Sequence, residues 1–170
     1  MALHLSAIGW LHTLASLYAL VAGALVLSEP KGDRAHKRAG RHYLYGAAVA
    51  NLSALGIHKI AAFHLFHGFA LLSLACLALA FGGACLQAPR RYWLRIHLSA
   101  MLFSYYQLVA ALIHEVFTRT HVLEMRHFPL VYTQGLALLA FLMTVSYFWG
   151  RTAPSAPSSR IYDQQPTAGQ

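Results

Sequence analysis

The sequence predicts an all-α integral membrane bundle of five transmembrane helices. Of the 170 residues, 58% are hydrophobic and only 11% are charged, whereas about a quarter of a soluble domain is charged. Five apolar runs each approach the ~20 residues that a helix needs to cross a bilayer. They cover residues 3–27, 42–60, 63–86, 93–117 and 130–149. The basic residues lie between these runs, so the net charge of +8 indicates membrane topology and no nucleic-acid partner.

The distribution of the basic residues predicts the orientation of the chain. Short cytoplasmic loops of membrane proteins carry an excess of lysine and arginine. We therefore expect the N-terminus outside and the C-terminus in the cytoplasm, because most basic residues then lie inside. These residues are Lys31, Arg34, Lys37, Arg38, Arg41, Arg90, Arg91, Arg95, Arg151 and Arg160.

The first run, residues 3–27, has no lysine or arginine before it. A signal peptide begins with a positive region, so this run is expected to be a retained helix. His12 lies on the same stripe as small residues, the kind of surface through which membrane helices approach closely. We expect His12 to point inward with this stripe, which consists of Ala15, Ser16, Ala19, Ala22 and Gly23.

The second and third runs, residues 42–60 and 63–86, are separated by few residues and should form a tight hairpin. His58, near the end of the second run, shares a helical face with Asn51 and Ala54. His64 and His67 open the third run three residues apart, so both can face one direction.

The fourth run, residues 93–117, carries His97 near its start and His114 and Glu115 near its end. At about 100° per residue, Glu115 returns to the face of His97 after five turns. Ionisable groups that face lipid are costly, so this face is expected to point inward. It also holds Met101, Ser104, Leu108 and Ala111.

The fifth run, residues 130–149, completes the bundle. From residue 151 the composition becomes rich in Pro, Ser and Gln, which is typical of a polar tail. We therefore expect a transmembrane bundle in residues 1–150 and a tail in residues 151–170.

The predicted topology brings six ionisable side chains from four helices to the non-cytoplasmic side. Imidazoles and a carboxylate at one depth are suited to zinc, copper or iron, or to a b-type haem. The alternative without a cofactor is that histidines near helix ends bind water or lipid headgroups, and that Glu115 pairs with Arg119. The candidate cofactor-binding residues are His12, His58, His64, His67, His114 and Glu115, with His12, His67 and Glu115 as the candidate metal ligands.

A second set of basic and histidine residues lies on the predicted cytoplasmic side. Positive surroundings disfavour a dication and favour anions such as lipid phosphates. The candidate lipid or anion contacts are His36, Arg38, Arg41, Arg90, Arg91 and His97.

Three stretches of the sequence resemble a bacterial family of predicted membrane proteins, the domain of unknown function 2306. They read PKGDRAHKRAGRHYLYGAAVANLSALGI, FHLFHGFALLSLACLALAFGG and RIHLSAMLFSYYQLVAALIHEVFTR. The most specific positions are Lys31, Gly32, His36, Gly40, Tyr43, Asn51, Leu52, Ser53, Phe66, His67, His97, Met101, Ser104 and Tyr105. The resemblance implies a multi-pass protein of the bacterial inner membrane and implies no activity. It includes the candidates His12, His36, His67, His97 and Glu115, and it leaves out His58, His64 and His114.

The sequence contains no catalytic motif such as HExxH or a nucleophile elbow, so an enzyme is the less favoured interpretation. The first functional hypothesis is a non-catalytic accessory subunit of a larger inner-membrane complex of respiratory or photosynthetic type. Its partners would be the lipid bilayer and other membrane subunits. The alternative is a haem- or metal-binding redox protein that uses the His/Glu site on the periplasmic side.

Overall fold

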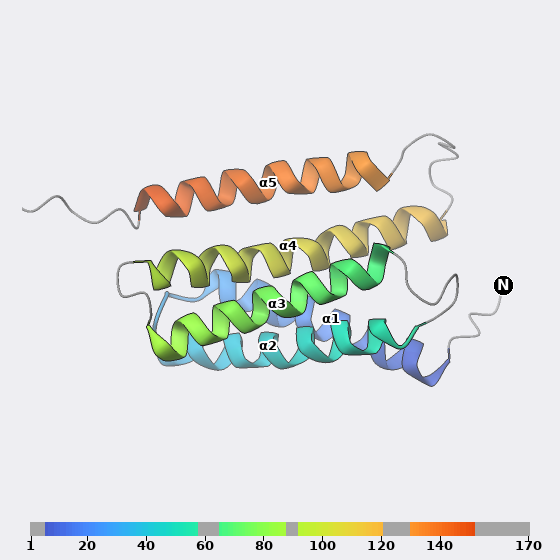
Figure 1. Ribbon diagram of the computed structural model, residues 1–170, viewed down its shortest axis with the longest axis horizontal. Coiled ribbons are helices and arrows are strands. Elements are labelled where there is room, and N and C mark those ends of the chain that lie inside the picture. The colour runs from blue at the N-terminus through green and yellow to red at the C-terminus, as the bar shows by residue number, and fades with distance from the viewer. Residues whose placement is uncertain (1–5, 58–64, 88–91, 121–129, 152–170) are drawn as a thin grey trace, which may run out of the picture.

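The computed structural model of the chain describes residues 6–57, 65–87, 92–120 and 130–151. These ranges form five α-helices and contain no strand, so the all-α prediction is confirmed. Figure 1 shows the helices running back and forth along one axis. The helices are α1 (Ala7–Ser28), α2 (Arg34–Leu55), α3 (Leu65–Leu86), α4 (Trp93–Thr120) and α5 (Leu130–Arg151).

Three of these helices, α1, α3 and α4, are long and apolar enough to cross a membrane. The helix α2 begins at Arg34, inside the basic loop, whereas its apolar run begins only at His42. In the described part of α5, the apolar stretch is Gly135–Arg151, which is shorter than those of α1, α3 and α4. A helical membrane protein is therefore confirmed, while the number of five crossings and the orientation stay predictions.

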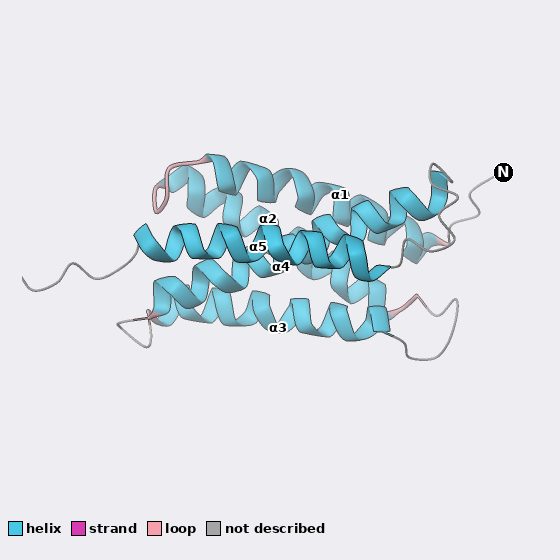
Figure 2. Ribbon diagram, turned by 90° about the horizontal axis from the view of Figure 1, so that it is seen from above, coloured by secondary structure: helices cyan, strands magenta, loops and turns pink. Residues whose placement is uncertain are grey.

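The first four helices form a ring. The closest packing joins α1 to α2 and α3 to α4, and smaller contacts join α2 to α3 and α1 to α4. Of the described helices, α5 contacts only α4. Figure 1 shows α5 beyond α4, on the side away from α1, α2 and α3, and in Figure 2, seen from above, α5 lies over α4.

Side chains in the loops fix where α1 and α2 begin and end. The hydroxyl of Ser6 accepts a hydrogen bond from the backbone N–H of Gly9, and a carboxylate oxygen of Asp33 accepts one from His36, so both helices have N-caps. The ammonium of Lys31 donates to three carbonyls at the end of α1, those of residues 26, 27 and 29. Gly32 follows with a φ of +89°, which only glycine adopts freely.

The core of the ring is built mainly from small residues, with Tyr43 as its largest fully buried side chain. In the predicted small-residue stripe of α1, Ala19, Ala22 and Gly23 are buried and Ala15 and Ser16 are half-buried. Small residues let membrane helices approach closely, and close approach provides the dispersion contacts that hold such helices together.

The predicted inward face of α4 is confirmed over only part of its length. Ser104 is buried, and Met101 and Leu108 pack against the core. Ala111 and Glu115, further along the same stripe, are exposed, so the prediction that they face inward is wrong. The described α4 residues that pack against the core cluster are Met101, Tyr105 and Leu108, all of which precede Ala111.

Candidate functional site

The interior of the ring holds polar side chains that hydrogen-bond from one helix to another. The Tyr43 hydroxyl on α2 lies 2.7 Å from Oγ of Ser104 on α4. The two residues are 2% and 1% exposed. A buried hydroxyl needs a partner in the apolar interior, and each of these two satisfies the other. The bond therefore fixes how α2 and α4 face each other.

The ring of Tyr105 fills the space next to Gly23 on α1. A Cβ at Gly23 would lie 2.3 Å from the Tyr105 ring, so a larger residue cannot occupy this position without displacing it. The Tyr105 hydroxyl donates to the carbonyl of Leu20 at 3.3 Å, and its ring lies edge-on to that of Tyr43 with centroids 5.9 Å apart. The absence of a side chain at Gly23 lets α4 reach α1.

His12 connects α1 to α2. Its Nδ1 lies 2.9 Å from the carbonyl oxygen of Ala50, and 3.4 Å from Oγ of Ser53. A carbonyl can only accept, so a ring proton lies on Nδ1, and in the neutral ring Nε2 has the lone pair. A histidine that ligates a metal commonly has this arrangement, with one ring nitrogen held by a carbonyl and the other available.

His97 makes the equivalent contact between α4 and α3. Its Nδ1 lies 2.8 Å from the carbonyl oxygen of Ala80. Asn51 adds a further bond between helices, because its amide donates to Oγ of Ser73 at 3.2 Å as well as to the carbonyl of Ala47 in its own helix. The polar side chains found here in the ring thus join α1, α2, α3 and α4 to their neighbours.

The predicted His/Glu site is only partly described. His67, at the start of α3, is 4% exposed, and the ring of Phe66 contacts that of His114 on α4 with centroids 5.9 Å apart. This contact brings the ends of α3 and α4 together. Glu115, the neighbour of His114, is exposed.

The metal site itself stays a prediction. Among the described residues, no three His, Cys, Asp or Glu side chains form a group that could hold a metal ion. His12 lies in the contact between α1 and α2, whereas His67 lies on α3, which is not in contact with α1 in the described ring. His58 and His64 lie outside the described residues.

The predicted cytoplasmic set lies around the start of α2. Arg38 and Arg41 are exposed and His36 is half-buried, while Arg90 and Arg91 lie outside the described residues. Burial lowers the pKa of His36, and the positive charges of Lys31 and of nearby His97 lower it further. His36 of α2 and His97 of α4 are thus close enough to interact electrostatically.

The tyrosine contacts were not predicted as a site. Tyr43, Ser104 and Tyr105 belong to the most specific positions of the family resemblance, but their pairing depends on helix rotation. Tyr18 on α1 and His42 on α2 form another pair, joined by a hydrogen bond of 2.5 Å between the hydroxyl and Nδ1. One sequence feature could have indicated these contacts. The aromatic and imidazole groups lie on helix faces that also carry small residues, where helices approach closely.

Comparison with known proteins identifies a family. A family model described as "Predicted membrane protein (DUF2306)" matches residues 9–150. No curated protein and no solved structure matches the chain.

Proposed function

Because this chain belongs to the DUF2306 family of predicted membrane proteins, we propose that it is a non-catalytic accessory subunit of a larger complex in the bacterial inner membrane. The respiratory or photosynthetic type of complex is the kind we expect. The observation that carries the proposal is the position of α5, which contacts only α4 among the described helices.

The outer face of α5 has the spacing of a helix–helix contact. Its most exposed large side chains follow one another at intervals of four, three, four and four residues, which places them on a single stripe. Each is more than half exposed: Tyr132 60%, Leu136 72%, Leu139 59%, Met143 74% and Tyr147 54%. Lipid alone gives helices little reason to associate, so a helix with one neighbour gains packing from a second partner.

The interior of the ring supports a structural role. Five polar side chains form hydrogen bonds to groups of another helix. They are His12, His97, Asn51, Tyr43 and Tyr105. These hydrogen bonds fix the helices relative to one another, as a rigid scaffold requires. A scaffold with an outer helix that contacts a single neighbour among the described helices is suited to lateral docking.

Purification in a mild detergent tests the subunit hypothesis. We expect the tagged protein to migrate as a complex with stoichiometric co-purifying membrane subunits. The double change Leu136→Trp and Met143→Trp should reduce this co-purification, whereas Leu79→Trp, at an equally apolar position on α3 that is 60% exposed, should leave it intact. A preparation that contains only the monomer would refute the hypothesis.

A redox protein that binds haem or a metal at the predicted periplasmic side is the second candidate. Two observations favour it: His67 is buried at the same end as His114, and a carbonyl holds Nδ1 of His12, so that Nε2 is the nitrogen that would bind a metal. Glu115 would then supply a carboxylate near that end. A visible absorption spectrum with elemental analysis tests it, and a protein without a Soret band or a stoichiometric metal would end it.

A further inference from the structure

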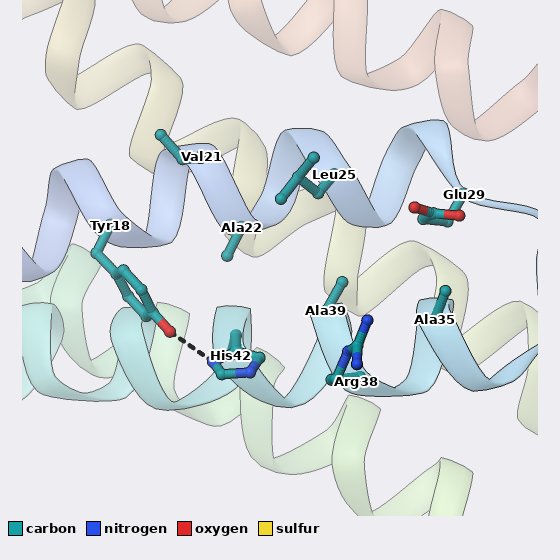
Figure 3. Close-up of a pocket in the computed structure, with 9 residues that line it drawn as sticks. All are labelled: Tyr18, Val21, Ala22, Leu25, Glu29, Ala35, Arg38, Ala39 and His42. Atoms are coloured by element: carbon teal, nitrogen blue, oxygen red, sulfur yellow. Dashed lines mark hydrogen bonds between the residues drawn. The ribbon is translucent and has the colours of Figure 1, made fainter.

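A groove of about 220 Å³ lies on the outer surface between α1 and α2, toward the end predicted to be cytoplasmic. Figure 3 shows Tyr18 of α1 pointing toward His42 of α2, and Arg38 of α2 pointing toward α1. The residues that matter for its chemistry are Tyr18, Val21, Leu25 and Glu29 of α1, and Arg38 and His42 of α2.

The α2 side of the groove presents two nitrogen donors. Arg38 and His42 are four residues apart and therefore lie on one helical face. The Tyr18 hydroxyl holds Nδ1 of His42 at 2.5 Å. With the hydroxyl donating, Nε2 carries the ring proton. Figure 3 shows this second ring nitrogen on the side of the ring toward Arg38. The guanidinium and Nε2–H together suit the oxygens of a phosphate.

The α1 side presents a carboxylate. Glu29 follows the last turn of α1 and lines the same groove. In the described part of the chain, no ion pair joins Glu29 to Arg38, although both line this small space. A charge of each sign thus faces the groove, and the two charges do not neutralise each other by direct contact.

The α1 side of the groove also has an apolar wall. Val21 and Leu25 are 64% and 53% exposed. They share the groove with Arg38, whose stretch of α2 also carries Arg34, Lys37 and Arg41 and belongs in the headgroup layer. A soluble phosphate compound gains nothing from Val21 and Leu25, whereas a lipid places an acyl chain on them.

We propose that this groove binds the headgroup of an aminophospholipid of the phosphatidylethanolamine type. Arg38 and Nε2 of His42 bind the phosphate diester, Glu29 binds the primary ammonium, and the start of an acyl chain lies on Val21 and Leu25. An anionic lipid without an amine leaves Glu29 facing a like charge. A phosphatidylcholine offers Glu29 no N–H donor. This assignment does not depend on the subunit hypothesis.

Native mass spectrometry of the delipidated full chain in detergent tests the assignment. The protein is titrated separately with dioleoyl phosphatidylethanolamine, phosphatidylglycerol and phosphatidylcholine. For the wild type we expect one bound phosphatidylethanolamine with an affinity at least about fivefold above the other two lipids, the effect of one charged contact at a membrane surface. This comparison uses only the wild type, so it stays decisive even if a variant fails to fold.

Three variants then examine the individual contacts. Arg38→Gln should weaken phosphatidylethanolamine binding about fivefold, and Glu29→Gln should abolish its advantage over phosphatidylglycerol. Lys37→Gln, on the same helix but outside the groove, is the matched control and should change neither value. Equal or tighter binding of phosphatidylglycerol by the wild type overturns the proposal. An unchanged lipid ratio in Glu29→Gln, or an equal loss in Lys37→Gln, overturns it as well.

Discussion

The hydroxyl of Tyr43 lies 2.7 Å from Oγ of Ser104, and this bond joins α2 to α4 through the middle of the ring. Ser104 also donates to the carbonyl of Met101 in its own helix, at 2.9 Å. The Tyr43 hydroxyl is therefore the donor to Ser104 when Ser104 uses its proton on Met101. This hydrogen bond and the edge-on contact between the rings of Tyr43 and Tyr105 join the two helices in a core that otherwise consists mainly of small side chains.

Tyr43→Phe should lower the free energy of unfolding by breaking this bond while keeping the ring in place. Hydrogen bonds between membrane helices contribute on average ~0.6 kcal/mol, so we expect a coupling of about this size. The measurement is a double-mutant cycle of Tyr43→Phe and Ser104→Ala, followed by unfolding in mixed detergent micelles. A coupling of zero would show that the contact does not stabilise the fold.

Gly23→Ala should destabilise the protein because the new Cβ lies where the Tyr105 ring is, at 2.3 Å. The ring must move, and it then loses its bond to the Leu20 carbonyl. Overpacking of this kind costs about 1–3 kcal/mol. Gly68→Ala on α3 is the control, because nothing lies within 4 Å of a Cβ built there, and alanine favours a helix by up to about 1 kcal/mol. Thermal unfolding of both variants in detergent compares them, and equal midpoints would contradict the structure.

His12→Asn separates a structural role from a ligand role. The asparagine amide can replace Nδ1–H as a donor to the Ala50 carbonyl, so stability should be nearly that of the wild type. His12→Ala removes the donor and should cost ~0.6 kcal/mol or more. If His12 also binds a metal or haem through Nε2, His12→Asn keeps stability but loses the cofactor. Unfolding curves together with elemental analysis and an absorption spectrum distinguish the outcomes.

His36 should make stability depend on pH. Burial and the charge of Lys31 lower its pKa in the folded protein below the ordinary value of 6.5. Between the lowered pKa and the unfolded pKa, the unfolded chain binds more protons, so stability rises with pH through this window. The contribution is fully present above the unfolded pKa and is lost as the pH falls through the folded pKa.

His36→Gln should therefore flatten the pH dependence of unfolding below about pH 6.5 relative to the wild type. The difference between the two curves isolates His36 from the other histidines. An NMR titration of the His36 ring measures the same shift directly. A ring that titrates above the ordinary value would show that the electrostatic surroundings differ from those described.

The structure gives a physical reason for several of the residues that carry the resemblance to the family. Lys31 caps the end of α1, and Gly32 takes up the positive φ that follows. Tyr43 and Ser104 pair, and His97 donates to the Ala80 carbonyl. These roles are structural.

The sequence by itself determined that the chain is helical and membrane-embedded, because apolar runs of bilayer length leave the backbone no other way to satisfy its hydrogen bonds. It also determined the inward stripe of α1, since small residues at helical spacing mark close approach. Only the tertiary structure decided which polar groups meet. The rotation of neighbouring helices and the distance between them decide these features. They are the pairing of Tyr43 with Ser104, the pairing of Tyr18 with His42, the exposure of Glu115 and the position of α5 outside the ring. Those quantities result from side-chain packing between segments that are distant in the chain, and no local periodicity contains them.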